Sequence, residues 1–150
     1  MNIFLRPALE PVKRLLSEAG LPTADLTPRH LEHFLAQGSD QRLTGTVGLE
    51  IDGDVALLRS LAVAADCRGR GYGQELVAAA ERHARSQGVN ELYLLTTTAQ
   101  RFFERLGYRA SARATAPAAI SATQEFASMC PASAAFMVKE LVPGIAAEPG

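Results

Sequence analysis

Residues 67–76 read CRGRGYGQEL, and their glycines and arginines are residue types that bind anions together. Glycine opens backbone N–H groups to a ligand because no Cβ stands in the way. Arg68 and Arg70 could add charge-assisted hydrogen bonds to a phosphate. The apolar stretch 55–65 runs into this segment, and good helix formers follow it from Gln74. N–H groups at such a helix N-terminus, together with the helix dipole, would favour a pyrophosphate.

The segment matches neither of the two commonest phosphate-binding patterns. Its glycines fall at 69, 71 and 73 rather than at G-x-G-x-x-G spacing, and no Walker A lysine follows. Two other interpretations therefore stay open at this point. Gly71 and Gly73 could form a plain strand-to-helix turn with solvated arginines. The segment could also be an RGG-like nucleic-acid tag, although such tags normally lie in disordered, repetitive tails.

The elements that would position this segment follow from periodicity and from turn residues. Alternation at 42–51 and the apolar run at 55–65 predict two strands, joined by a hairpin at 52–54 because Asp-Gly tolerates positive φ angles. Helical spacing predicts a helix from 72 to about 87, closed by Gly88. The other predicted elements are a strand at 2–7, a helix at 9–20 closed by Gly20, a short helix with Thr27 as cap and Pro28 at its first position, a strand at 90–98, a helix at 99–107 closed by Gly107, a strand at 108–113, a loop around 116–121, a helical turn near Gln124 and a last strand at 134–141.

The predicted order is β-α-α-β-β-β-α-β-α-β-β, an α/β (α+β mixed) sheet with helices on both sides. We expect one domain over residues 1–141 and a flexible tail at 142–150, which has prolines and glycines but no periodicity. The net charge is −1, so any anion site must be local, and we expect neither a nucleic acid nor a membrane as partner.

Two cysteines without a CxxC pair predict neither a disulfide framework nor a metal site. No basic N-terminal region with an apolar run is present, and no run reaches transmembrane length, which predicts a cytoplasmic protein with reduced thiols. We expect a small molecule as partner, and the sequence leaves the formation of a homodimer open.

The stretch LLRSLAVAADCRGRGYGQELV, residues 57–77, resembles the central motif of the GCN5-related N-acetyltransferases (GNAT). In that family a strand followed by R/Q-x-x-G-x-G/A holds the pyrophosphate of acetyl-CoA, and Arg68, Gly71 and Gly73 fill the pattern. AQRFFERLGYR, residues 99–109, resembles the family's next motif, A-x-x-F-Y-E-x-x-G-F. The two motifs cover roughly residues 41–112, and the element order extends the resemblance over nearly the whole domain.

The resemblance implies the acyl-CoA N-acyltransferase fold and direct transfer of an acetyl group from acetyl-CoA, with no metal. The backbone of Leu61 to Val63 would pair with pantetheine like an added strand, and the amides from Gly69 to Gln74 would hold the pyrophosphate. The cofactor-binding residues that it implies are Leu61, Ala62, Val63, Arg68, Gly69, Arg70, Gly71, Tyr72, Gly73, Gln74, Phe102 and Arg105.

A narrower resemblance concerns the acceptor. Residues 91–108 and 117–141 are similar to the arsenic-resistance N-acetyltransferases. Relatives in the wider family acetylate the amino group of glutamate-like phosphinate and arsinate amino acids. The implied acceptor is therefore the primary amine of a small, anionic molecule, such as an amino-acid-like arsenic or phosphinic compound.

Both positions that usually supply the proton-transfer groups of this family hold residues that cannot take that role. The central strand reads Val-Ala-Leu-Leu at 55–58 where many relatives have a glutamate base, and Phe103 replaces the tyrosine acid. An alkylamine, with a pKa of about 10, must lose a proton before it attacks. The catalytic residues are therefore unknown, with Glu50 and Ser60 as weak candidates. The vacancies also favour a second hypothesis, a catalytically idle acyl-CoA sensor or interaction module.

The candidate acceptor-site residues each allow two interpretations. Counting outward from the hairpin places Glu50 opposite Ala56, away from the pantetheine end, as a base or a solvated carboxylate. Arg59 could bind an acceptor carboxylate or oxyanion, or pair with a nearby acid. His30 and His33 lie in a segment that often covers the acceptor site, and could be bases or surface side chains.

The polar and aromatic residues in and near the second motif also allow two interpretations each. One threonine of 96–98, with Thr97 as the substrate-binding candidate, could bind pantetheine or a water, or cap the helix at Ala99. Tyr93 and Tyr108 are more typical of a core than of an acid, and Phe102 and Phe103 fit the pantetheine channel or the core. Cys130 could bind arsenic through its sulfur, but a lone cysteine is usually a small buried hydrophobe. Cys67 is a loop thiol beside two arginines.

Overall fold

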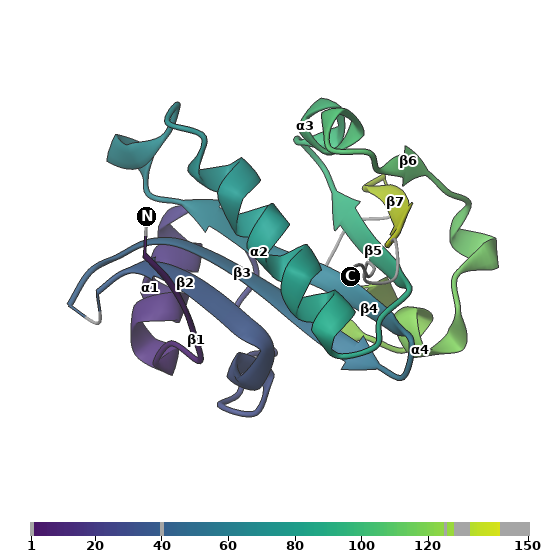
Figure 1. The fold of residues 1–150 in the computed structure, drawn as a ribbon, viewed down its shortest axis with the longest axis horizontal. Helices are drawn as coiled ribbons and strands as arrows, with labels where there is room; N and C mark the ends of the chain where they lie inside the picture. Colours follow the sequence, from purple (N-terminus) through teal and green to yellow (C-terminus); the bar gives the residue numbers. More distant parts are fainter. Residues whose placement is uncertain (1, 40, 125, 128–132, 142–150) are drawn as a thin grey trace, which may run out of the picture. The chain divides into compact units, whose positions relative to one another are not determined.

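The computed structural model describes residues 2–39, 41–124, 126–127 and 133–141. Within these residues seven strands form one mixed sheet in the order β1-β2-β3-β4-β5-β7-β6 (Figure 1). The strands are β1 (Ile3–Leu5), β2 (Phe34–Gly38), β3 (Leu43–Asp52), β4 (Val55–Val63), β5 (Glu91–Thr96), β6 (Arg109–Ala110) and β7 (Ala135–Glu140). The helices are α1 (Leu9–Glu18), α2 (Tyr72–Ser86), α3 (Gln100–Arg105) and α4 (Ala118–Ser121), with 3-10 turns η1 (His30–His33), η2 (Ala65–Cys67) and η3 (Arg113–Thr115). β4 and β5 are parallel, and β1–β2, β2–β3, β5–β7 and β6–β7 are antiparallel.

The predicted α/β class and the order of the principal elements are confirmed. The hairpin turns at Gly53, whose φ is 65°, and Gly88, with a φ of 85°, follows α2. The predicted order contains three consecutive strands before the long helix, but the periodicity located only two of them, now β3 and β4. The structure shows that the first of the three is β2. It is five residues long and follows η1 directly, so no turn residue separates it from the loop before it.

Three local predictions are wrong. The short helix expected from Thr27 and Pro28 is the 3-10 turn η1, because Thr27 bonds the His30 ring instead of capping a helix. The strand expected at 108–113 pairs only through β6, since the chain turns away into η3. The loop expected at 116–121 contains α4, which begins after Pro117 and buries Ile120.

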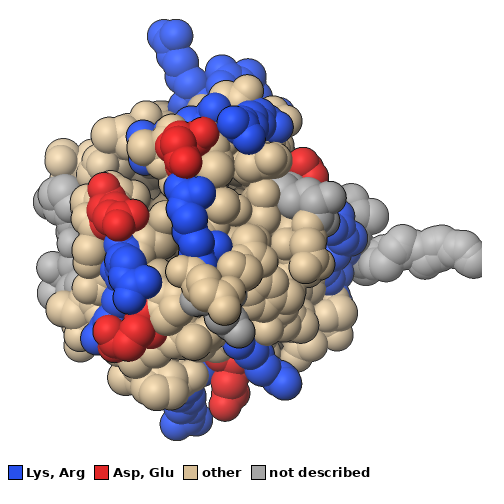
Figure 2. All heavy atoms as spheres, turned by 90° about the vertical axis from the view of Figure 1, so that its left-hand side faces the viewer, with Lys and Arg blue, Asp and Glu red and all other residues tan. Residues whose placement is uncertain are grey.

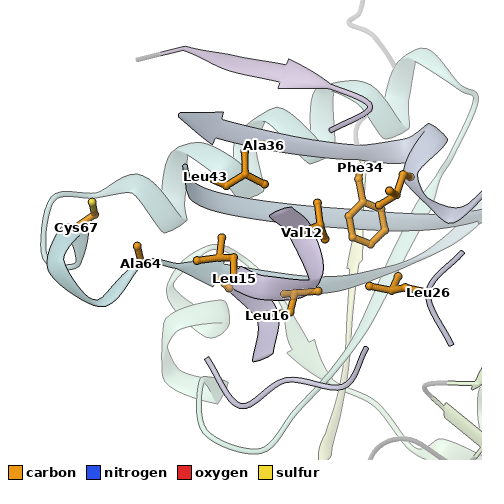
Figure 3. Close-up of a cluster of buried hydrophobic side chains, with 11 residues drawn as sticks. Val12, Leu15, Leu16, Leu26, Phe34, Ala36, Leu43, Ala64 and Cys67 are labelled. Carbon is orange, nitrogen blue, oxygen red and sulfur yellow. The ribbon is translucent and has the colours of Figure 1, made fainter. Parts of the chain in front are cut away.

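The chain divides into two compact units, each with its own core. The first comprises the residues up to Glu50 and Leu58–Arg82. Its helix α1 buries the predicted face of Val12, Leu15 and Leu16. Figure 3 shows these side chains gathered with those of β2, β3 and the loops, and the whole cluster is Val12, Leu15, Leu16, Leu26, Leu31, Phe34, Ala36, Leu43, Ala62, Ala64 and Cys67.

The second unit comprises Ile51–Leu57 and the residues from His83 onward. The Tyr93 and Phe136 rings stack 5.4 Å apart, and Phe126 meets Phe136 edge-on at the same distance. Lys139 Nζ donates to Leu106 O at 2.9 Å and so closes the C-terminal end of α3. Gln124 and residues 126–127 are helical, as expected, and the predicted tail at 142–150 lies outside the described residues. None of the described helices combines the length and apolar character needed to cross a bilayer.

Candidate active site

The glycine-rich segment forms the connection between β4 and α2. After β4 ends at Val63, η2 follows, and α2 begins at Tyr72. Gly69 and Gly71 have φ angles of 81° and 79°, which L side chains rarely adopt. A Cβ added at either position would meet no heavy atom of the described chain within 4 Å. The backbone therefore follows a path that suits glycine, and space lies open beside it.

The start of α2 leaves donors beside this open space. Glu75 N donates to Gly71 O at 3.2 Å, and this is the first bond of the helix. The N–H groups of residues 72–74 precede that bond, and no earlier turn of the helix can accept from them. A 15-residue helix adds partial positive charge at the same end. These features fit a pyrophosphate, which accepts several N–H bonds at once.

The two arginines of the segment differ in their attachment. Arg68 Nε donates to Val63 O at 3.1 Å, which ties the loop to the end of β4. Arg70 is exposed. Nearby, Arg42 pairs with Asp66 at 2.5 Å, with both side chains exposed. On the face drawn in Figure 2, acidic side chains lie among the basic ones, so positive charge is local there. The interpretation with fully solvated arginines does not apply to Arg68.

A buried cluster of charges lies on β3, β4 and the loop after α1. The Arg59 side chain is 1% exposed, and its Nη1 and Nη2 donate to the two carboxylate oxygens of Asp25. The second of these bonds, to Oδ1, measures 2.8 Å. Nη1 also donates to Glu50 Oε2 at 2.8 Å. Of the two carboxylates, Asp25 is 5% exposed and Glu50 is 21% exposed. The ion-pair alternative for Arg59 is therefore what the structure contains.

Asp25 has an acidic carboxyl because of its partner. Burial alone would raise the pKa of Asp25, but the hydrogen bonds and charge of Arg59, with a contribution from His30, lower this pKa below its ordinary value. Asp25 reaches Arg59 because Leu26, beside it, is buried in the core of the first unit and fixes the loop. The sequence contains no signal for this pairing, since the two residues are 34 positions apart.

Ser60 follows Arg59 in the middle of β4 with a φ of 60°. Arg59 Nε donates to Ser60 Oγ at 3.1 Å, and Thr46 Oγ1 donates to Ser60 O at 2.9 Å. A residue other than glycine in the left-handed region is strained, by roughly 1–2 kcal/mol. Such strain persists only where neighbours hold it, and it is concentrated at functional sites. Two side chains from the same unit hold it here.

The imidazole of His30 contacts Thr27, three residues earlier in the same loop. The Thr27 N–H points at His30 Nδ1 at 3.2 Å, and the Thr27 hydroxyl lies 3.0 Å away. Because a backbone N–H can only donate, Nδ1 is the acceptor of this bond. His30, Asp25 and Glu50 have ligand atoms within 4.8 Å of one another. The Arg59 cation already bridges the two carboxylates, so this donor set favours no metal ion.

Comparison with known proteins shows the family to which this chain belongs. Residues 2–108 match the model of the Acetyltransferase (GNAT) family. The chain belongs to this family. It is 41% identical over 68 residues to an amino-acid acetyltransferase of Ectopseudomonas mendocina, which covers 45% of the chain and 16% of the relative. It is 44% identical over 55 residues to an uncharacterized N-acetyltransferase of Chlorobaculum tepidum, covering 37% of the chain and 35% of the relative. The chain therefore matches only a minor part of either curated relative.

Solved structures show the same fold. N-acetylglutamate synthase from Neisseria gonorrhoeae, complexed with coenzyme A and N-acetyl-glutamate, superposes with a TM-score of 0.77 at 20% identity, covering 94% of this chain and 35% of that one. A Mycobacterium tuberculosis protein in complex with CoA also has a TM-score of 0.77, at 17% identity, covering 95% of this chain and all of that one. At these identities the similarity establishes the fold, as the GNAT resemblance predicted.

In the second unit of this GNAT chain, polar candidates mostly support structure. Thr96 Oγ1 accepts from Ala99 N at 2.9 Å in the turn before α3, whose N-cap is Ala99 with no side-chain cap bond, so Thr96 does not take the capping role left open. Thr97 is exposed. Tyr93 donates to Glu91 Oε1 at 3.0 Å, and burial, together with that carboxylate, raises the pKa of Tyr93 to about 12. A phenol that holds its proton so firmly is a poor acid near neutral pH.

The aromatic side chains at the start of α3 have different exposures. Phe103, at the family's tyrosine position, is 4% exposed and meets Tyr108 edge-on at 5.5 Å. Phe102 is half-buried and Arg105 exposed, so both keep surface that a ligand can reach. Phe103 and Tyr108 thus take the core role that the sequence left open for them.

The cysteines contribute little to the site. Cys67 is 8% exposed and belongs to the core of the first unit, with its Sγ donating to Asp66 Oδ1 at 3.6 Å. It is a small core side chain rather than an open loop thiol. Cys130 lies outside the described residues. His33, the other predicted histidine, is half-buried at the end of η1.

The strain at Ser60 yields a prediction on stability. Ser60→Gly and Ser60→Ala both remove the hydroxyl, but only alanine keeps a Cβ in the left-handed region. We expect the glycine variant to be the more stable by about 0.5–1 kcal/mol, because the strain relieved exceeds the extra backbone entropy of glycine. Urea denaturation of both variants measures the difference. An alanine variant at least as stable as the glycine variant would show that Ser60 carries no strain.

The Asp25–Arg59 pair predicts a pH-dependent stability. The folded-state pKa of Asp25 is lowered, so its stabilising contribution is complete above about pH 4 and is lost as the pH falls through that lowered value. Asp25→Asn should lower the free energy of unfolding at neutral pH by about 1.5–3 kcal/mol, the contribution of hydrogen bonds to a charged group. Thermal melts at a series of pH values should show this gap closing in acid. Asp66→Asn breaks an exposed Asp–Arg pair instead and should change the melting temperature little.

Proposed function

We propose that the chain is an acetyl-CoA-dependent N-acetyltransferase that acetylates the primary amine of a small molecule. The observation that carries this proposal is the loop before α2, in which Gly69 and Gly71 leave open space beside the N-terminal donors of a long helix. Membership of the GNAT family supports it. Further support is that structures of the same fold, including one from Thermoplasma acidophilum with a TM-score of 0.62, are complexes with coenzyme A.

The residues proposed to hold acetyl-CoA belong to the end of β4, the loop before α2, the start of α2 and α3. The N–H groups of 69–74 would bind the pyrophosphate, with Arg68 and Arg70 adding charge. The backbone of Leu61 to Val63, at the end of β4, would pair with the pantetheine. Phe102 and Arg105 on α3 are proposed as further contacts. Bound acetyl-CoA would supply a thioester whose acetyl group moves to the amine.

The proposed proton acceptor is Glu50. The amine arrives as an ammonium ion and must lose a proton to form the N–C bond. Over the whole reaction the C–S bond breaks, the CoA thiol keeps one proton and one proton is released. Glu50 fits the acceptor role because its carboxylate is partly exposed and its Oε1 has no bond among the described residues. Ser60 is proposed to donate a hydrogen bond where negative charge develops.

The proposed acceptor is a small, anionic molecule that carries a primary amine. An amino-acid-like arsenic or phosphinic compound, and with it a role in arsenic resistance, comes from the narrower resemblance. The name of the Ectopseudomonas relative, an amino-acid acetyltransferase, supports an amino-acid acceptor. Arg59 does not add support, because its guanidinium already holds two carboxylates. Thr97 stays a proposed substrate contact. A cytoplasmic location and a homodimer also stay predictions.

Two measurements test the proposal. Calorimetry with acetyl-CoA should show binding at micromolar concentrations, and its failure would refute the cradle. Release of free CoA should then be followed with L-glutamate, L-lysine, putrescine and a glutamate-like phosphinic amino acid as acceptors. Turnover above the hydrolysis background with any of them supports an enzyme. Binding without any turnover favours the idle acyl-CoA-binding module, which the buried Leu57, Leu58 and Phe103 at the usual catalytic positions would suit.

A further inference from the structure

Asp25 is not part of the proposed cradle, and its carboxylate binds Arg59, the same side chain that binds the proposed proton acceptor Glu50. We infer that Asp25 is a positioning residue of the acetyl-transfer reaction: it fixes the Arg59 guanidinium, and Arg59 in turn orients the Glu50 carboxylate and the Ser60 hydroxyl. This inference rests on the proposed function and names a residue that the catalytic motifs of the family do not indicate.

The geometry of the guanidinium makes this transmission rigid. Its three nitrogens lie in one plane, so two bonds to a single carboxylate fix the direction of all its donors. Asp25 supplies these two bonds through Oδ1 and Oδ2. The shared Nη1 then meets Glu50 Oε2 at 2.8 Å, and Nε meets Ser60 Oγ at 3.1 Å. A change at Asp25 therefore alters both functional groups together.

The arrangement sets the chemistry of each group. Ser60 Oγ receives a bond from Arg59 Nε, so the Ser60 proton is left to donate elsewhere. Asp25 is 5% exposed and Glu50 is 21% exposed, so a ligand can reach only the second carboxylate. Two carboxylates share one guanidinium, which leaves a net charge of −1 on the three side chains. Arg59 therefore holds Asp25 and Glu50 together, and a change at Asp25 alters how Arg59 binds the Glu50 carboxylate.

The charged and titratable groups around Glu50 come from four segments. Asp25 belongs to the loop after α1, His30 to η1, Glu50 itself to β3 and Arg59 to β4. His30 Nδ1 accepts from the Thr27 N–H, which ties this ring to its own loop. Asp25 and Glu50 share the Arg59 guanidinium, so removing the Asp25 charge most directly changes the attraction between Arg59 and Glu50.

The test compares Asp25→Asn, which removes the charge, with Asp25→Glu, which keeps it but adds one methylene. The full chain is assayed with acetyl-CoA and with L-glutamate and putrescine as acceptors, and kcat/KM is measured against pH. For Asp25→Asn we expect kcat to fall about 10-fold or more and the acid limb of the kcat/KM profile to move to lower pH, because Arg59 then pairs with the Glu50 carboxylate alone. Calorimetric affinity for acetyl-CoA should not change. Asp52→Asn, at the exposed end of β3, is the control and should behave as the wild type.

A purely structural role gives a different result. If Asp25 only holds its loop, any loss of activity follows the folded fraction and the acid limb stays in place, which overturns the inference. Should Asp25→Asn not fold, Asp25→Glu decides: displacement of Arg59 should lower kcat with the acid limb unmoved, and an unchanged kcat overturns the inference. Absence of wild-type turnover with either acceptor, after acetyl-CoA binding has been shown, instead refutes the proposed enzyme and this inference with it.

Discussion

Replacement of Gly71 by valine is expected to weaken acetyl-CoA binding about 100-fold or more, while the ligand-free chain loses only a few degrees of melting temperature. Gly71 has a φ of 79°, and an added Cβ would meet no atom of the described chain within 4 Å. The protein itself therefore has room for the side chain. The space that it would fill is where we place the pyrophosphate.

The magnitudes separate the two effects. A side chain in the left-handed region costs roughly 1–2 kcal/mol, and each kcal/mol lowers the melting temperature by about 2–4 °C at this chain length. Each hydrogen bond to a charged group contributes about 1.5–3 kcal/mol, so losing two phosphate bonds weakens binding by at least about 100-fold. Calorimetry with acetyl-CoA and thermal melts without it measure the two quantities separately.

Gly53 provides the matched control. Its φ is 65°, and an added Cβ there would also meet nothing within 4 Å, but it lies in the hairpin between β3 and β4. Gly53→Val should cost similar stability and leave acetyl-CoA affinity unchanged. If both variants bind acetyl-CoA like the wild type, Gly71 serves only a turn. The proposed cradle would then be wrong.

Local patterns made the glycine-rich loop before α2 and the hairpin predictable. Gly53 after Asp52 determines a tight turn within three residues, and Gly71 lies between a buried strand and a helix. In both cases a turn needs a positive φ angle, and the glycine that adopts it lies in the same short segment of the chain. The prediction at Thr96 was open for a related reason. Capping and ligand binding need the same hydroxyl, and the sequence could not show that this hydroxyl bonds Ala99 N in the turn before α3.

The charge cluster was not predictable, because its members meet through tertiary packing. Asp25 lies in a loop without periodicity, next to the buried Leu26, and its carboxylate binds Arg59. Counting residues from the hairpin placed Glu50 opposite Ala56, but it could not show that the long Arg59 side chain reaches the Glu50 carboxylate. The left-handed backbone of Ser60 is likewise invisible in a strand-forming sequence, since the bonds that hold it come from elsewhere in the unit.

Replacement of Glu50 by glutamine is expected to lower kcat by about 100-fold to 10,000-fold, the usual contribution of a positioned proton acceptor. Glutamine has nearly the same shape, and its amide oxygen can still accept from Arg59 Nη1. The Asp25 pair with Arg59 remains, so the melting temperature should change little. Affinity for acetyl-CoA should not change, because Glu50 has no part in the cradle. Glu32→Gln, an exposed change of the same type in η1, is the control and should retain activity.

The pH dependence of this deficit identifies the role of Glu50. An alkylamine acceptor has a pKa of about 10, so at neutral pH nearly all of it is an ammonium ion that needs a proton acceptor. As the pH rises toward that value, a larger fraction of the amine is already neutral, so fewer molecules need Glu50 to take their proton. The ratio of wild-type to variant kcat/KM should therefore shrink with increasing pH. A ratio that stays constant would mean that Glu50 orients the amine without taking its proton. Full activity of the variant at neutral pH would remove Glu50 from the mechanism and leave deprotonation to solvent.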